Sequence, residues 1–153
     1  MNDPAAQDPS AALRAARPIM AALARPHRWL YARYGGRLIN RKPDSTVIML
    51  TTSGRRSGEA RSVLINHVKD GDDFLVVGSN WGYEAAPAWV LNLRANPAAT
   101  VTIAQQAIPV IAEFLGDEPR HSAWIKITDE FPQMDQVAAS TTRELPVIQL
   151  APS

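Results

Sequence analysis

The sequence contains no cysteine among its 153 residues. This absence excludes disulfide bonds, thiolate metal sites and cysteine nucleophiles together, and it is compatible with a reducing compartment. The three histidines, His27, His67 and His121, lie far apart in the chain and form no cluster of the metal-binding kind. We therefore expect no bound metal, and we interpret His67, in the middle of a predicted strand, as structural rather than catalytic.

The sequence also lacks long apolar runs and internal repeats. No run approaches the about 20 apolar residues that span a bilayer. The chain opens with MNDPAAQDP, where an acid precedes any apolar stretch, so we predict no signal peptide and a cytoplasmic location. The length and the ordinary composition are typical of one globular domain with its own core.

Charge is distributed unevenly along the chain. The formal net charge is +1, yet residues 1–61 hold eleven Lys and Arg against four Asp and Glu, and residues 62–153 hold five against eleven. Up to Lys42, apolar pieces such as PIMAALA and WLY alternate with the arginines. This pattern suits a weak peripheral contact with an anionic membrane surface. The alternative is that these helices pack across the domain with their arginines in solvent.

The predicted secondary structure changes near residue 42. We assign residues 1–41 to a tail and a helical segment broken by Pro18 and Pro26, and residues 42–153 to a strand-rich domain. Strands are expected at 46–52, 60–69, 74–78, 100–104, 108–115 and 145–150, and helices at 87–97 and 117–131. Because short hairpins join consecutive strands, we predict an α+β domain built on a small barrel, with Pro109 in an edge strand.

The segment TTSGRRSGEARS, residues 51–62, directly follows an apolar strand and offers an anion site. Gly54 and Gly58 would let backbone N–H groups turn inward, and guanidiniums suit phosphate or carboxylate. The candidate side chains are Arg55, Arg56, Ser57 and Arg61. A solvated hairpin tip with surface arginines is the alternative. Nucleic acid is disfavoured, because the loop has no aromatic residues among its basic ones.

Four motifs follow one another in order: GRRSGEAR in this loop, GSNWG at 78–82, PAWVLNLRANPAATV at 87–101 and RELPVIQL at 143–150. In this order and spacing the chain resembles the deazaflavin-dependent nitroreductase and quinone reductase family over about residues 42–150. The resemblance implies a flavin-binding-like split β-barrel with N-terminal helices and short peripheral helices. It also implies an oxidoreductase that transfers a hydride from reduced coenzyme F420 to an apolar acceptor such as a quinone, an activated alkene or a nitro compound.

The resemblance further implies which residues bind the cofactor. The loop GRRSGEAR, residues 54–61, which we call the arginine loop, would hold the phosphate and acidic tail of the cofactor, and later residues would line its deazaflavin ring. The implied cofactor-binding residues are Arg55, Arg56, Ser57, Gly58, Arg61, Ser79, Asn80, Trp81 and Trp89. Asn80 and Trp81 stand where family members that carry SKGG have a lysine and a glycine, so we expect one cation fewer and a narrower cleft mouth.

The acceptor pocket is expected at Phe131, Met134 and Val137, where the nitroreductase prototype has tyrosines. Because no phenol is present at these positions, an apolar acceptor is favoured. The alternative is that Phe131 and Met134 only pack in the core. Tyr83 is then the nearest phenol and a candidate proton donor. Three other readings stay open: a split barrel binding flavin mononucleotide, a non-catalytic deazaflavin carrier, and a basic membrane-surface protein without redox activity.

Overall fold

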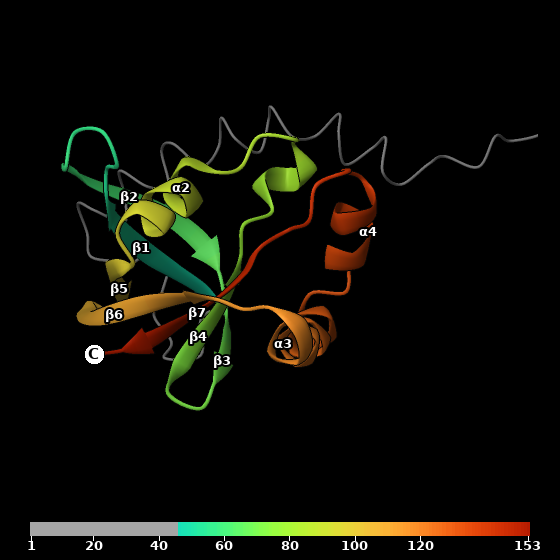
Figure 1. Ribbon diagram of the computed structural model, residues 1–153. Coiled ribbons are helices and arrows are strands. Elements are labelled where there is room, and N and C mark those ends of the chain that lie inside the picture. The colour runs from blue at the N-terminus through green and yellow to red at the C-terminus, as the bar shows by residue number, and fades with distance from the viewer. Residues whose placement is uncertain (1–45) are drawn as a thin grey trace, which may run out of the picture.

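The computed structural model describes residues 46–153 (Figure 1). The predicted N-terminal tail and helical segment, residues 1–41, lie outside the described residues, as do the first residues of the predicted strand-rich domain.

The described residues form one curled antiparallel sheet, a half-barrel (Figure 1). Its seven strands run in the spatial order β2-β1-β5-β6-β7-β4-β3. Their bounds are β1 Val47–Ser53, β2 Ala60–Asn66, β3 Val68–Asp70, β4 Asp73–Val77, β5 Ala98–Ile103, β6 Gln106–Phe114 and β7 Val147–Pro152. Every neighbouring pair is antiparallel, and the predicted α+β split barrel is confirmed. Short hairpins account for the pairs β1–β2, β3–β4 and β5–β6, because antiparallel neighbours can be joined by a tight turn.

Alternation along the strands decides which face is buried. In β1, Ile48, Leu50 and Thr52 point into the core, and the residues between them are only half-buried. The β1–β2 pairing runs without a slip from Val47 opposite Asn66 to Ser53 opposite Ala60. This unbroken ladder makes the segment a rigid base for the loop at its end, because a shift by one residue would turn the apolar side chains outward.

Within residues 46–153, four helical elements accompany the sheet: η1 Asn80–Gly82, α2 Ala88–Ala95, α3 Asp117–Glu130 and α4 Met134–Ala139. Pro87 precedes α2, as expected for a residue without a backbone N–H, and Trp89, Val90 and Leu93 of this helix enter the main core. The helix α3 packs Ala123 and Ile127 on a second cluster beside β4 and β7. Figure 1 shows α3 and α4 together at one end of the sheet.

Two sequence predictions need correction. The strand predicted at 60–69 is divided at His67 into β2 and β3, which pair with different neighbours. Pro109 does not lie in an edge strand, because β6 pairs with both β5 and β7. The missing N–H is tolerated at the point where β7 ends: the β6–β7 ladder begins at Val110, and the Pro109 carbonyl accepts the N–H of Ser153 at 3.1 Å.

Candidate active site

A cleft with a volume of ≈ 1140 Å³ lies between β2, the η1 turn, the start of α2 and the α3–α4 corner. Pockets for single small molecules usually measure about 300–1,000 Å³, so this cleft has room for an elongated ligand and a second molecule. The predicted site residues that line it are Arg55, Arg56, Ser57, Arg61, Ser79, Asn80, Trp81, Tyr83, Trp89, Phe131, Met134 and Val137. Gly58 does not line it and serves the β1–β2 loop with a φ of +71°.

The arginine loop, residues 54–61, is closed by its own backbone. The N–H of Gly54 donates to the carbonyl of Glu59 at 2.8 Å, and the N–H of Gly58 donates to the carbonyl of Gly54 at 2.7 Å. The N–H of Arg55 is also engaged, by Asn92. The predicted inward-facing N–H nest is therefore wrong for these three groups, since each already has a partner inside the protein. An anion would have to be bound by the guanidiniums.

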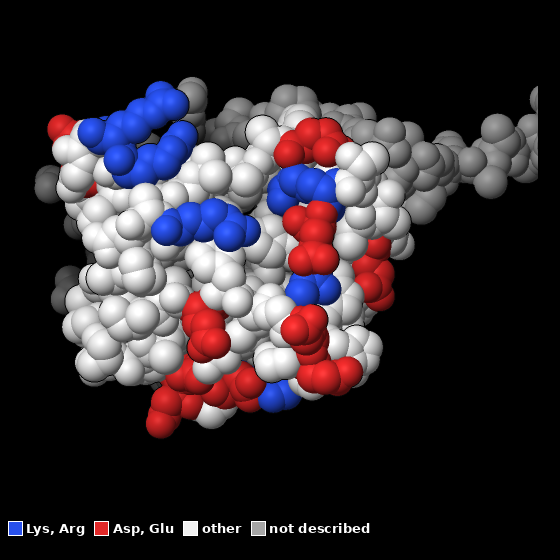
Figure 2. Space-filling model, in the orientation of Figure 1, with Lys and Arg blue, Asp and Glu red and all other residues white. Residues whose placement is uncertain are grey.

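Those guanidiniums are available to a ligand. Arg55, Arg56 and Arg61 are exposed, and Figure 2 shows Lys and Arg side chains gathered over the β1–β2 loop. Arg61 donates to the Glu59 carboxylate at 2.7 Å, with the two side chains 61% and 67% exposed. An ion pair this exposed contributes little stability, so a ligand anion can replace Glu59 at low cost. The pairing places a negative charge beside one of the three arginines, which reduces the repulsion among them.

Asn92 is a site residue that sequence reasoning did not single out. It is 5% exposed, and its amide bridges two elements by donating to Thr52 Oγ1 at 3.0 Å and accepting from the N–H of Arg55 at 3.1 Å. The signal was present in the PAWVLNL motif, where a polar residue sits on the buried face of an apolar helix. A buried amide of this kind needs partners, and here the partners fix the arginine loop.

The η1 turn carries the second group of predicted residues. Asn80 and Trp81 both have positive φ, +43° and +55°. Asparagine tolerates this left-handed conformation, whereas for the tryptophan it costs about 1–2 kcal/mol. The Asn80 amide donates to the carbonyl of Ala85 at 2.8 Å, so this end of the side chain holds the turn rather than facing a ligand. Ser79 lines the cleft at the start of the turn.

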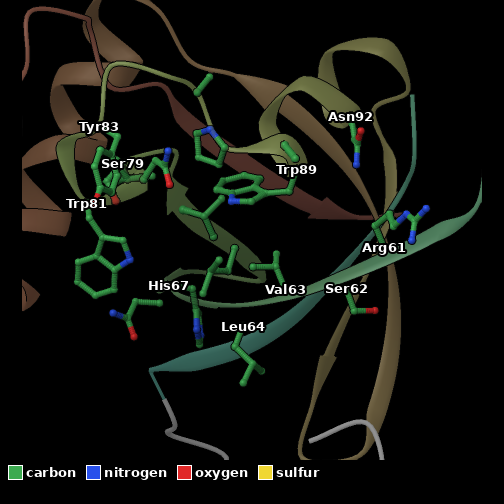
Figure 3. Close-up of a pocket in the computed structure, with 18 of the residues that line it drawn as sticks. Arg61, Ser62, Val63, Leu64, His67, Ser79, Trp81, Tyr83, Trp89 and Asn92 are labelled. Atoms are coloured by element: carbon green, nitrogen blue, oxygen red, sulfur yellow. The ribbon is translucent and has the colours of Figure 1, made fainter. Parts of the chain in front are cut away.

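An apolar wall separates these two polar regions. In Figure 3, Trp89 lies between Val63 of β2 and the η1 turn, at the centre of the cleft. At the far end, Val137 is 4% exposed, and Met134 packs on the second core cluster. For Met134, core packing and cleft lining, which the sequence left as alternatives, thus coincide.

His67 is buried beside the cleft. Its Nδ1 lies 3.1 Å from the carbonyl oxygen of Thr46, and its ring lies 5.4 Å from the Phe74 ring. Burial lowers the pKa of His67, and the nearby positive charge of Lys69 lowers it further. The hydrogen bond to Thr46 raises the pKa but only partly offsets the effect of burial. A neutral, anchored imidazole agrees with a structural role.

Among residues 46–153, no three His, Asp or Glu side chains lie together in a way that would hold a metal ion. Within the same residues, no helix combines the length and the hydropathy needed to cross a membrane.

The solved structures most relevant to this geometry share its fold. The structure of F420-H2 Dependent Reductase (FDR-A) superposes with a TM-score of 0.64 and 27% sequence identity, over 69% of this chain and 93% of that one. A chain solved as a domain-swapped dimer superposes with a TM-score of 0.66 at 24% identity, over 82% of this chain and 98% of that one.

The chain is also similar in sequence to known proteins. The F420H(2)-dependent quinone reductase Rv1261c of Mycobacterium tuberculosis is 27% identical over 132 residues, covering 84% of this chain and 89% of that protein. Rv3178 of the same organism is 30% identical over 112 residues, covering 73% and 93%. The family model for F420H(2)-dependent quinone reductases matches residues 23–152. The chain therefore belongs to the F420H(2)-dependent quinone reductase family, whose members are oxidoreductases that use coenzyme F420.

Proposed function

We propose that this protein transfers a hydride from reduced coenzyme F420 to a quinone in the cleft described above. The main support is the order of side-chain types along one cleft. Exposed guanidiniums lie at one end, an indole and β2 side chains in the middle, and an apolar pocket at the other end. A long molecule with a polyanionic tail and a planar ring matches this order.

The donor set fits the cofactor tail. Arg55, Arg56 and Arg61 would bind its phosphate and glutamate carboxylates through charge-assisted hydrogen bonds, and the Ser57 hydroxyl adds a neutral donor. A single phosphate, as in flavin mononucleotide, needs fewer cations than this loop carries. The arginine loop therefore supports the deazaflavin over the flavin mononucleotide alternative.

The middle of the cleft would hold the ring and exclude water. Trp89, Val63 and Ile65 supply apolar surface there, and Ser79 supplies a hydroxyl at the edge. When bound, reduced coenzyme F420 supplies the hydride, and one proton completes the two-electron reduction of a quinone to its hydroquinone. The residues of this chain orient the two molecules and keep water away from the transfer.

The acceptor would bind at Phe131, Met134 and Val137, which offer carbon and sulfur surface and no hydroxyl. Such a pocket suits a quinone ring, and we extend the proposal to activated alkenes and nitro compounds of similar shape. Tyr83 is 39% exposed and lines the cleft, so its phenol is our candidate proton donor, with water as the alternative source.

We also propose that the N-terminal segment brings the enzyme to an anionic membrane surface, where apolar quinones dissolve. The support is the excess of basic residues up to Lys42, eight against two acids. Each basic residue near such a surface adds about 1 kcal/mol, which gives reversible, salt-sensitive attachment. Liposome co-sedimentation of the full chain and of a variant starting near Asn40 tests this. Equal recovery of both in the supernatant at low salt would contradict it.

The central test is a titration of the purified full chain with reduced F420, oxidised F420 and flavin mononucleotide, followed by quinone reduction under single-turnover conditions. We expect F420 to bind about tenfold or more tightly than flavin mononucleotide, with an affinity that weakens as salt rises. Oxidation of bound F420H2 by added quinone would support an enzyme. Tight binding without oxidation by any quinone, alkene or nitro compound would instead identify a deazaflavin carrier.

A further inference from the structure

The RELPVIQL motif begins at Arg143, for which the proposed function has no role. Its guanidinium donates to three backbone carbonyls of one short segment: from Nε to Tyr83 at 2.8 Å, and from one terminal nitrogen to Ser79 at 2.8 Å and Gly78 at 3.1 Å. Arg143 is half-buried, and a planar fork of this kind can hold several acceptors at once in a fixed geometry. These carbonyls flank the η1 turn on both sides.

A second set of hydrogen bonds joins residues 78–84 to residues 141–143, and here a side chain of the first segment accepts. The Glu84 carboxylate accepts from the Thr141 hydroxyl at 2.9 Å, from the Thr142 N–H at 3.1 Å and from the Thr142 hydroxyl at 3.0 Å. We call the two sets together the 78–84 clamp. It ties the η1 turn to the segment that follows α4, the helix bearing two of the proposed acceptor-pocket residues.

The clamp encloses the most strained backbone of the cleft. Asn80 and Trp81 are consecutive left-handed residues with side chains, and such strain persists only where the surroundings fix it. Two further backbone hydrogen bonds close the turn, from Gly82 N–H to Ser79 at 2.8 Å and from Tyr83 N–H to Asn80 at 3.0 Å. The result is that the backbone at Trp81 is held, which fixes the direction in which its side chain leaves the turn.

That direction is toward the cleft opening. Trp81 lines the cleft while remaining 36% exposed, so the indole is neither a core residue nor a free surface side chain. Figure 3 shows it projecting from the turn, below Ser79 and Tyr83, toward the side of the cleft where His67 lies. A rigid ring at this place narrows the opening through which an acceptor approaches the proposed ring site.

We propose that Trp81 is a specificity-determining residue that restricts the cleft to narrow acceptor rings, and that Arg143 is the residue that positions it. This inference rests on the proposed function and goes beyond it, because it states which acceptors the same site prefers. The selection is by size: a one-ring quinone fits past the indole, and a two-ring quinone clashes with it. Arg143 does not line the cleft and would act through the turn that it holds.

The experiment measures dissociation constants for a one-ring benzoquinone and a two-ring naphthoquinone, using the full chain saturated with oxidised F420 so that no hydride is transferred. Quenching of tryptophan fluorescence reports binding, because Trp89 lines the cleft in every variant. The variants are Trp81→Gly, Trp81→Phe, Arg143→Lys and the double variant. Trp124→Phe is the control, since its indole bonds to Asp135 at 2.9 Å, outside the cleft. The values of kcat/KM with F420H2 are then compared for both quinones.

Glycine adopts positive φ freely, so Trp81→Gly should keep the turn while removing the ring. We expect it to shift the affinity ratio toward the naphthoquinone by about tenfold, the usual effect of one group in an apolar pocket. Trp81→Phe and Trp124→Phe should keep the wild-type ratio. Arg143→Lys should shift it in the same direction as Trp81→Gly, and adding it to Trp81→Gly should change nothing more, because its effect passes through the indole.

An unchanged ratio in Trp81→Gly would overturn the inference, whatever the turnover rates. A ratio that Arg143→Lys changes equally with and without Trp81 would overturn the positioning role. Failure of the proposed function looks different: wild-type protein would oxidise no F420H2 with either quinone. In that case the binding ratio with oxidised F420 still decides the role of Trp81, and no binding of either quinone would overturn it.

Discussion

The side-chain carbonyl of Asn92 accepts the backbone N–H of Arg55 at 3.1 Å, which ties helix α2 to the loop that carries the cations. The same amide donates to the buried Thr52 Oγ1 at 3.0 Å. The arginine loop is therefore anchored from inside the core, at the first of its arginines, while their charged ends stay in solvent. A fixed base reduces the ordering cost of binding a flexible, polyanionic molecule.

Replacing Asn92 by alanine should weaken both the fold and the site. Two buried or half-buried groups would lose their partner, which costs about 1–3 kcal/mol of unfolding free energy, and the released loop should bind F420 less tightly. Urea denaturation and F420 titration measure the two effects. Asn96→Ala is the matched control, because Asn96 caps the same helix but is exposed, and its side chain accepts from the N–H of Ala98 at the start of the next strand. Wild-type F420 affinity in Asn92→Ala would show that the anchor is not needed.

Removing single guanidiniums should affect binding without affecting the fold. We expect Arg56→Ala and Arg61→Ala each to weaken F420 binding by roughly 1–3 kcal/mol, the range of a charge-assisted hydrogen bond, with nearly unchanged melting temperatures because both side chains are exposed. Arg94→Ala is the control: this exposed arginine lies over the Phe114 ring at 4.2 Å and does not line the cleft. A variant that melts early yet binds normally would mark its arginine as structural.

The sequence predicts the fold well because its signals are local. Apolar alternation and hairpin turns predict the strands, and Pro87 predicts the start of α2. The short helix α4 was missed because six residues are too few to show helical periodicity. The prediction that Pro109 lies in an edge strand was wrong for a different reason. Whether a strand lies at an edge depends on pairing with distant parts of the chain, and here β7, at the end of the chain, pairs with the free side of β6.

For the site, the sequence predicts residue types but not their partners. The arginine loop could be read from composition, yet the use of the Gly54 and Gly58 N–H groups inside the loop depends on backbone geometry. Arg143 stood in a recognised motif without a role, since its three carbonyl partners lie about 60 residues earlier in the chain. That the proposed site residues bind F420 stays a prediction, which the arginine variants test.

Acidification should destabilise the protein through His67. Burial lowers the pKa of this imidazole below its usual 6.5, so the folded protein disfavours the charged form. Below pH 6.5 the unfolded chain therefore binds a proton that the folded chain does not. The stabilisation is complete above pH 6.5 and is lost progressively as the pH falls toward the lowered folded pKa.

Urea denaturation between pH 7.5 and 5.5 measures this dependence, in a window above the carboxylate range. His67→Gln should flatten the curve over this window and His121→Gln, at an exposed position, should leave it unchanged. An equally steep curve in His67→Gln would assign the proton uptake to another group.

Gly78 precedes the η1 turn and leaves no room for a side chain. A Cβ there would lie 2.6 Å from Val90 Cγ2 and 2.7 Å from Pro146 Cγ, and Val90 is itself fully packed in the core. We expect Gly78→Ala to lower the unfolding free energy by about 1–3 kcal/mol, the usual cost of overpacking. Because the Gly78 carbonyl accepts from Arg143, the displaced backbone should also loosen the clamp and shift acceptor preference as Arg143→Lys does.

Gly116→Ala is the matched control for this substitution. Nothing lies within 4 Å of a Cβ built at Gly116, and its φ of −123° suits any residue. Gly116 is the N-cap of α3, where alanine is less favourable than glycine, and this loss opposes the gain from restricting the unfolded chain. We therefore expect a change in unfolding free energy of less than about 1 kcal/mol. Urea denaturation of both variants gives the comparison, and quinone affinities give the second readout. If Gly78→Ala is as stable as Gly116→Ala, the packing at the root of the turn is looser than these distances imply. If it is destabilised but keeps the wild-type acceptor preference, the turn holds its conformation independently of the Gly78 carbonyl.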